Sequence, residues 1–202
     1  MMRLALVVTA VAAAIQSGQS EEKPVYPPFT VVITAKTGKL VPGDIAPLLN
    51  AIKAMKGYAE QISRQKVPGD WLENWTFEIP GDKKFDPTPF MNAFSRFNAS
   101  KFYLTLTGTL SQEAQTKKLF ITSFSGKSKV KLMNRPKGQF DDPDKKSEDI
   151  VGKLAELFAG GKLHYTVSGD IFNHGGALAI LLASYEEASP PPPPPKGKDD
   201  KK

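Results

Sequence analysis

Two segments of the chain match each other at a constant offset of 61 residues, without a gap. Their identical pairs are Phe97 with Phe158, Lys101 with Lys162, Thr105 with Thr166, Gly108 with Gly169 and Ser123 with Ser184. The offset is kept across the turn between the two strand-like parts of each segment. The match predicts two copies of a helix–strand–strand (αββ) unit, at 86–125 and 147–186. The alternative is that two amphipathic hairpins share their alternation without a common origin.

Three stretches carry apolar residues at helical spacing. The first is expected to begin at Asp44, a good N-cap, and to run to Arg64. The second is expected to follow Asp86, and the third to follow Ser147 and to stop at Gly160. The residues expected to face the core are, helix by helix, Ile45, Leu48, Leu49, Ile52, Met55, Ala59 and Ile62; Phe90, Ala93, Phe94 and Phe97; and Ile150, Val151, Leu154, Leu157 and Phe158.

Strand-like alternation fills the gaps between these helices. The clearest runs are Phe29 to Lys36, Trp75 to Ile79, Phe102 to Leu110 and Leu163 to Ile171. In the last run Tyr165 and Val167 alternate with His164 and Thr166, so one face of the sheet is expected to be apolar and the other polar. The predicted fold class is α+β: an antiparallel or mixed sheet, with three helices mainly on one face and the two αββ units within it.

The first twenty residues have the pattern of a cleavable secretory signal, with Arg3, the largely apolar stretch 4–15 and a small polar segment. This stretch is too short to cross a bilayer, which takes about 20 apolar residues. We therefore expect 1–20 to be removed, and the mature protein to be periplasmic or secreted without a permanent membrane anchor. After a lead-in at 21–28 we expect a single α+β domain at 29–188 and a proline-rich, charged, disordered tail at 189–202.

Charge and cysteine content limit the class of partner and the compartment. The formal net charge is +6, but Arg3 leaves with the signal and the tail holds four lysines against two aspartates. The body is therefore nearly balanced, which argues against nucleic acid as a partner. The chain has no cysteine, hence no disulfide and no lipid-bearing cysteine, a pattern that fits a bacterial envelope better than eukaryotic secretion.

Few residues offer catalytic or metal chemistry. His164 and Asp170 lie about 20 Å apart along an extended strand and cannot share an ion, and His174 is expected to be a polar turn residue. Acidic residues at 141–144 are expected to form a solvated loop, because they lack the spacing of an EF-hand. No cofactor or metal is predicted. An envelope hydrolase using His164 with nearby hydroxyl or carboxylate groups remains an alternative function.

Lys127, Lys129 and Lys131 alternate with smaller or apolar residues, and Arg135 and Lys137 follow. In a strand this pattern puts the ammonium groups on one face. The favoured interpretation is an edge strand protected by lysine against edge-to-edge pairing. The alternative is a strip that binds anionic lipid or glycan. Because aromatic residues are not interleaved with these lysines in the sequence, binding of single-stranded nucleic acid is disfavoured.

Trp71 and Trp75, four residues apart, could form a sugar-stacking platform, although closure of a core edge is the favoured interpretation. The sequence is thus rich in scaffold signals and poor in reactive groups. The leading expectation is an exported, non-catalytic binding or structural domain of the cell envelope, whose partner is an envelope protein or an anionic surface. Candidate ligand-binding residues are His164, Lys127, Lys129, Lys131, Trp71 and Trp75.

Overall fold

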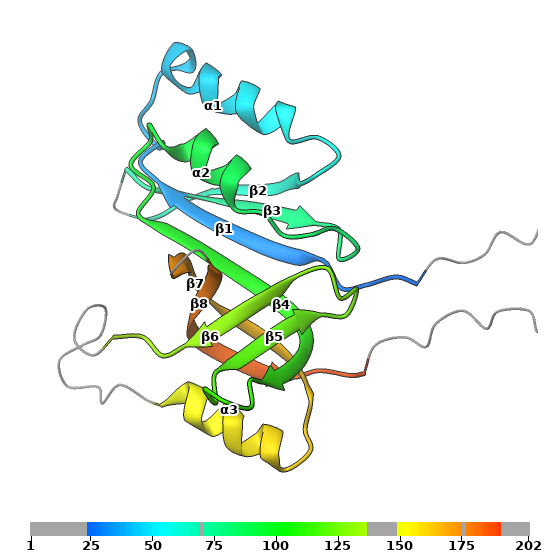
Figure 1. The fold of residues 1–202 in the computed structure, drawn as a ribbon. Coiled ribbons are helices and arrows are strands. Elements are labelled where there is room, and N and C mark those ends of the chain that lie inside the picture. The colour runs from blue at the N-terminus through cyan, green and yellow to red at the C-terminus, as the bar shows by residue number, and fades with distance from the viewer. Residues whose placement is uncertain (1–23, 69–70, 137–148, 175–176, 191–202) are drawn as a thin grey trace, which may run out of the picture. The chain divides into compact units, whose positions relative to one another are not determined.

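The computed structural model describes residues 24–68, 71–136, 149–174 and 177–190, and within them the chain forms one mixed sheet and three helices (Figure 1). The elements are β1 (Phe29–Ala35), α1 (Pro42–Ala54), β2 (Glu60–Lys66), β3 (Glu73–Ile79), α2 (Thr88–Phe94), β4 (Lys101–Gln112), β5 (Leu119–Ser123), β6 (Lys129–Met133), α3 (Ile150–Ala159), β7 (His164–His174) and β8 (Ala177–Glu187). The predicted α+β class, with a mixed sheet, is confirmed.

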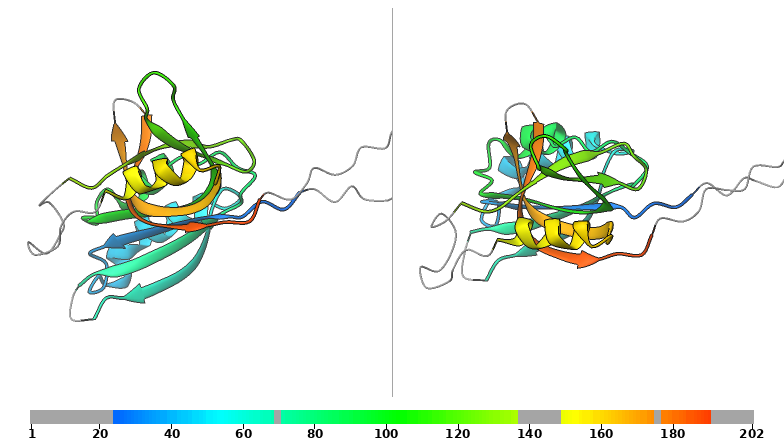
Figure 2. Two further views of the ribbon diagram at one scale, coloured as in Figure 1. Left: turned by 90° about the horizontal axis from the view of Figure 1, so that it is seen from below. Right: turned by 60° about the horizontal axis from the view of Figure 1, so that its bottom comes forward.

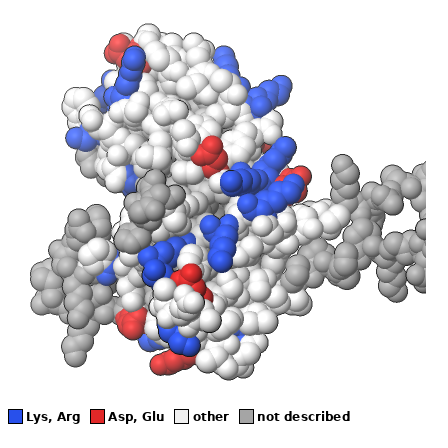
Figure 3. Space-filling view, in the orientation of Figure 1, with Lys and Arg blue, Asp and Glu red and all other residues white. Residues whose placement is uncertain are grey.

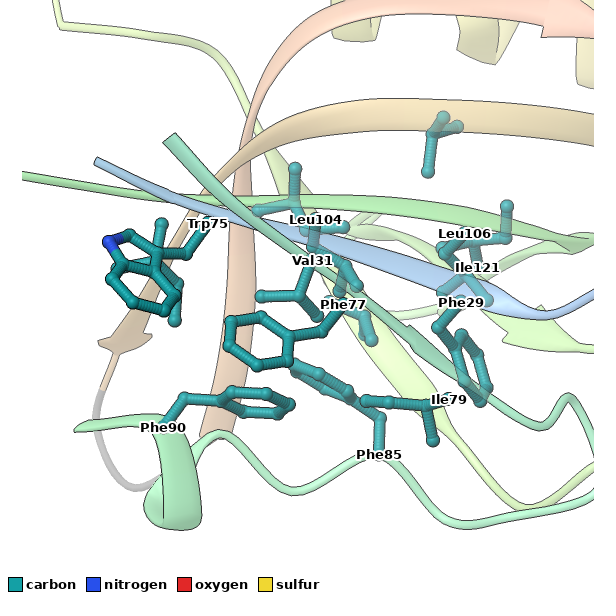
Figure 4. Close-up of a cluster of buried hydrophobic side chains, with 14 of the residues drawn as sticks. Phe29, Val31, Trp75, Phe77, Ile79, Phe85, Phe90, Leu104, Leu106 and Ile121 are labelled. Carbon is teal, nitrogen blue, oxygen red and sulfur yellow. The ribbon is translucent and has the colours of Figure 1, made fainter. Parts of the chain in front are cut away.

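The first half of the sheet is antiparallel, in the order β2-β3-β1-β4. Alternate residues of β1 and β3 are buried on one face, and α1 and α2 lie over that face (Figure 1). Aromatic rings fill the layer between sheet and helix: Phe77 of β3 meets Phe90 of α2 edge-on, with ring centroids 5.2 Å apart (Figure 4). The apolar residues of the second predicted helix therefore build this core, as expected.

The second half of the sheet closes on itself. Going round, β4 pairs with β5, β5 with β6, β6 with β8, β8 with β7, and β7 again with β4. All contacts are antiparallel except β6 with β8, and α3 lies between the third and fourth strands of the ring in the sequence. This order is the topology of an OB-fold, a five-stranded Greek-key barrel.

The buried face of the first half continues into the barrel interior. Val31 of β1 pairs with Leu104 of β4, and both are fully buried. Further along β4, Leu110 pairs with the buried Ile121 of β5 inside the barrel. The third helix, α3, lies across one end of the barrel (Figure 2), where Leu154 is fully buried. The helices thus share one face of the sheet, and the other face points outward along its whole length.

The first predicted helix is too long. The helix α1 ends at Ala54, and Gly57 then takes a left-handed conformation with φ of +89°. The residues that follow form the strand β2, in which Ile62 is 48% exposed rather than in the core. The helix also begins earlier than expected, at Pro42, and Asp44 lies in its first turn instead of capping it.

The starts of the other two helices follow local hydrogen bonding. The Asp86 carboxylate accepts a hydrogen bond from the Thr88 amide, at 2.9 Å, just before α2. The cap of α3 is Asp149, whose carboxylate accepts the Gly152 amide at 2.7 Å. The expected cap, Ser147, lies outside the described residues. Gly161, with φ of +88°, follows the end of α3 as predicted.

The two matching segments both fold as a helix followed by two antiparallel strands, α2-β4-β5 and α3-β7-β8. In each, a glycine allows close approach: a Cβ on Gly108 or Gly169 would come within 2.1 Å of a carbonyl oxygen of the next strand. The cross-strand registers differ, however, because Gly108 pairs with the buried Ser123, whereas the exposed Ser184 pairs with Ser168 at a bulge. A common origin of the two units therefore stays a prediction.

Candidate ligand-binding face

The two lysines of β6, Lys129 and Lys131, point outward from the barrel, while Val130 and Leu132, which alternate with them, are buried, as the alternation predicted. The interpretation of β6 as a protected edge strand is wrong. β6 pairs with β5 through Val130 and its neighbours and with β8 through Leu132 and its neighbours. Because both of its sides carry strand partners, protection against edge-to-edge pairing does not explain Lys129 and Lys131.

Strand pairing sets these lysines in rows that cross the outer face of the barrel. Directly paired residues in a sheet project from the same face. One row crosses β7, β4, β5 and β6 through His164, Thr109, Thr122 and Lys129. The adjacent row crosses β4, β5 and β6 through Ser111, Phe120 and Lys131. Three of the predicted site residues, His164, Lys129 and Lys131, therefore belong to one continuous surface. We call this surface the outer β4–β6 face and include His164 of β7 in it.

An aromatic ring lies among the lysines of this face. Lys129 Nζ is 4.5 Å from the centroid of the Phe120 ring, a cation–π distance, and Lys131 is the cross-strand partner of Phe120. No aromatic residue is interleaved with these lysines in the sequence, and strand pairing brings one beside them from β5. Figure 3 shows Lys and Arg side chains gathered on the side of the molecule where β5 and β6 lie.

His164 has a hydroxyl and an aromatic ring as its neighbours. Its Nδ1 is 3.3 Å from Thr109 Oγ1, and its ring meets that of Phe124 edge-on at 5.5 Å between centroids. The hydroxyl comes from the other αββ segment, as the hydrolase alternative required, but the contacts of His164 include no carboxylate within the described residues. Those residues also contain no group of three potential metal ligands. The His174 side chain and the acidic loop at 141–144 lie outside the described residues.

Hydroxyl groups continue the surface along β4. Thr105 Oγ1 lies 2.8 Å from Ser168 Oγ, and Thr107 Oγ1 lies 2.8 Å from Thr166 Oγ1. Each pair uses one donor and one acceptor, which leaves further acceptor and donor capacity for water or a ligand. The outer face therefore combines hydroxyl groups, one imidazole, aromatic rings and ammonium groups.

The two tryptophans do not form a platform. Trp75 is fully buried in β3, where its Nε1 donates to Thr37 Oγ1 at 2.9 Å, and its ring meets that of Phe94 edge-on. Trp71 is 57% exposed, with Lys39 Nζ 3.8 Å from its ring centroid. The core interpretation is confirmed for Trp75, and its place among the ligand-binding candidates was wrong. Neither tryptophan belongs to the outer β4–β6 face.

Sequence reasoning missed Phe120 and Thr122 as members of the site. The alternation of residues 119–124 did carry a signal, because Leu119 and Ile121 are apolar and buried while the residues between them face outward. What the sequence lacked was the pairing of β5 with β6, which brings Phe120 beside the lysines. Lys127 is exposed in the turn before β6 and does not enter the paired rows.

Comparison of the chain with protein-family models, with curated proteins and with solved structures finds no significant match. Within the described ranges, none of the helices has the length and apolar character that a membrane crossing requires.

Proposed function

We propose that the chain is an exported, non-catalytic binding domain that holds an acidic glycan on the outer β4–β6 face. In OB-fold barrels the face of the second and third strands binds oligonucleotides and oligosaccharides, and these strands correspond to β5 and β6. Fold alone does not assign function, so the proposal rests on the side chains. The observation that carries it is the pair Lys129 and Lys131 beside Phe120, on a strand whose edges are both paired.

The chemistry of the face supports an anionic, hydroxyl-rich ligand. No described acidic side chain forms an ion pair with Lys129 or Lys131, so their charges are available to a ligand. The hydroxyls of Thr109 and Thr122 offer the donors and acceptors that sugar hydroxyls need. The apolar ring of Phe120 supplies a flat contact for the C–H face of a sugar.

Acidic glycan is favoured over single-stranded nucleic acid by two features. The N-terminal signal pattern points to a compartment where glycans are the common anionic polymers. Stacking of successive bases also needs several aromatic rings in a line, whereas the paired rows of this face contain one phenyl ring, that of Phe120. Nucleic acid is therefore kept as an outcome of the binding test.

Replacing Lys129 and Lys131 together with glutamine is expected to weaken binding to polygalacturonate about 10- to 30-fold, at roughly 1 kcal/mol per lost surface contact. The measurement is isothermal titration calorimetry at low salt, repeated at higher salt, where screening should weaken binding by the wild-type protein. The matched control replaces Lys53 and Lys56, which are exposed on or just after α1, and should bind like wild type.

If the Lys53 and Lys56 control weakened polygalacturonate binding as much as the Lys129 and Lys131 variant, the effect would come from net charge alone. That result would contradict a binding site on the outer β4–β6 face. Tighter binding to oligothymidylate than to polygalacturonate at the same salt would replace the glycan by nucleic acid. Neutral dextran should bind much more weakly, because it offers no anionic group to pair with the ammonium groups.

Export carries its own prediction. If residues 1–20 act as a cleaved signal, protein recovered from outside the cytoplasm should have the mass of a chain that begins near Glu21. Replacing Val7 and Val8 with aspartate should interrupt the apolar stretch and keep the precursor in the cytoplasm. A mature pool that retains Met1 would contradict export by this route.

A further inference from the structure

A cavity of about 400 Å³ opens on the outer face of the sheet, at the opposite end of β4 from the lysines of β6. Its walls come from β1, β3, β4, β8 and the residues after β6. The side chains that give it chemical character are Thr34, Asn74, Lys101, Tyr103 and Arg135. These residues lie far apart in the sequence, and the topology brings them to one place.

The cavity carries surplus positive charge. Arg135 Nη2 donates to Asp170 Oδ2 at 2.7 Å, so one of the two cations is matched by a carboxylate. The pairing is single, because Arg135 Nε and Asp170 Oδ1 have no hydrogen-bond partner among the residues that the structure describes. Lys101 is exposed and, among the described residues, forms no ion pair. Two cations against one anion leave the cavity suited to an anionic group.

The remaining walls are suited to a sugar ring. Thr34 Oγ1 donates to Asn74 Oδ1 at 2.8 Å, which occupies the amide oxygen and leaves the Asn74 Nδ2 donors for a ligand. Tyr103 presents an aromatic ring, with Lys101 Nζ 4.9 Å from its centroid. An ammonium group beside a ring and an amide donor can contact a carboxylate, an apolar sugar face and a hydroxyl at the same time.

The cavity and the lysines of β6 are joined by a line of hydroxyls. Between Tyr103 and Thr109, the outward residues of β4 are Thr105 and Thr107. Six residues of extended strand span about 20 Å. A polymer lying along β4 would reach both ends, whereas a single sugar would occupy only the cavity.

We propose that this cavity is a subsite for one acidic sugar unit, a sugar ring that carries a single anionic group. Its carboxylate contacts Lys101 and Arg135, its ring lies on Tyr103, and a hydroxyl accepts from Asn74. The proposal rests on the proposed glycan-binding function and names the unit that the polymer must contain. Asp170 competes with the ligand for Arg135 and so limits the affinity of the subsite.

The test follows chemical shifts of the full chain during titration with galacturonate, galactose or inorganic phosphate. Galacturonate should perturb Tyr103 and Asn74, and the other two should bind at least about fivefold more weakly. Lys101→Gln should weaken galacturonate binding about fivefold, and Asp170→Asn, which frees Arg135, should strengthen it by a similar factor. A gain in affinity is a result that structural damage does not produce.

Phosphate binding as tight as galacturonate binding would reduce the cavity to an anion site without sugar recognition and overturn the proposal. So would unchanged affinity in Lys101→Gln, an exposed substitution that leaves the core intact. Loss of polygalacturonate binding on replacing Lys129 and Lys131, with no effect of Lys101→Gln on polymer or monosaccharide, would reject the subsite while the proposed function stands. The Lys129 and Lys131 variant should bind galacturonate like wild type.

Discussion

Replacing Phe90 with alanine is expected to lower the free energy of unfolding by about 3–5 kcal/mol. Phe90 has no exposed surface, and its ring meets those of Phe77 and Tyr58 at centroid distances of 5.2 and 6.2 Å. Truncation removes the apolar burial and leaves a cavity between α2 and the sheet that the rigid strands cannot close. The measurement is denaturant unfolding followed by fluorescence, read as a lower midpoint at constant slope.

The neighbouring residue Met91 provides the matched control. It lies on the same short helix, but its side chain is 54% exposed. Met91→Ala should change the free energy of unfolding by no more than about 0.5–1 kcal/mol. Similar losses in the two variants would mean that α2 is not fixed against the sheet by its aromatic face, and would contradict the packing in Figure 4.

Helical periodicity was reliable where it was supported by burial and failed where a turn intervened. The spacing of Phe90, Ala93 and Phe94 predicted the buried side of α2 correctly. The same spacing carried the first helix past Gly57 to Ile62, although residues 60–66 form a strand. Ala59 and Ile62 satisfy helical spacing, and residues 60–66 have no apolar alternation of their own, so the pattern did not show that Gly57 ends the helix.

The closure of the barrel could not be predicted from the sequence. Alternation identifies which side of β6 faces inward, through Val130 and Leu132, but it carries no information about the neighbouring strand. The parallel contact of β6 with β8 joins residues separated in the sequence by the helix α3 and the strand β7. A short lysine-rich strand is typical of a sheet edge, and only this distant partner overturns that interpretation.

The sequence predicted which face of the sheet carries the candidate site, but not which residues make it up. His164 and Lys129 were expected on a polar face, and pairing through Thr109 and Thr122 puts them on the same one. Phe120 was missed because its importance depends on a cross-strand neighbour. Trp75 was chosen for its residue type, yet a large aromatic residue at the start of a strand is also what closes a core.

A buried carboxylate holds the three strands β1, β2 and β3 together at one end of the sheet. Glu73 Oε2 accepts hydrogen bonds from Thr37 Oγ1 at 2.5 Å and from Arg64 Nη2 at 2.8 Å. The Arg64 guanidinium also lies over the ring of the buried Trp75, 4.5 Å from its centroid. The buried Glu73 carboxylate therefore has both hydrogen-bond donors and a cation beside it, as a buried charge requires.

Hydrogen bonding decides the protonation of this carboxylate. Burial acts to raise the pKa of Glu73, but the hydrogen bonds from Thr37 and Arg64, with the positive charges of Arg64 and Lys66, outweigh it. The pKa of Glu73 in the folded state is therefore below its ordinary value of 4.5. A carboxyl group with a lowered pKa stabilises the fold above its ordinary pKa, and this contribution is lost as the pH falls through the folded-state pKa.

Replacing Arg64 with methionine should destabilise the protein by about 3 kcal/mol at pH 7, because it leaves the Glu73 carboxylate buried without its cation. The estimate is at the lower end for a buried pair, since 36% of the Arg64 side chain is exposed. Glu73→Gln should cost less, about 1.5–3 kcal/mol, because a neutral amide replaces the charge-assisted bonds and the charge left without its partner, that of Arg64, is partly exposed to water. Urea unfolding at pH 7 measures both losses.

The pH dependence separates the carboxylate from ordinary packing. As the pH falls below 4.5 and through the lower pKa of Glu73 in the folded state, the wild-type protein should lose the stability that ionised Glu73 provides. Glu73→Gln should show a smaller loss over the same interval, because glutamine does not titrate. The matched control is Glu78→Gln, on the opposite face of β3. The control variant should lose as much stability at acid pH as the wild-type protein. If both substitutions reduced the loss of stability at acid pH by the same amount, general surface charge, and not the Glu73 cluster, would set the acid sensitivity of the fold.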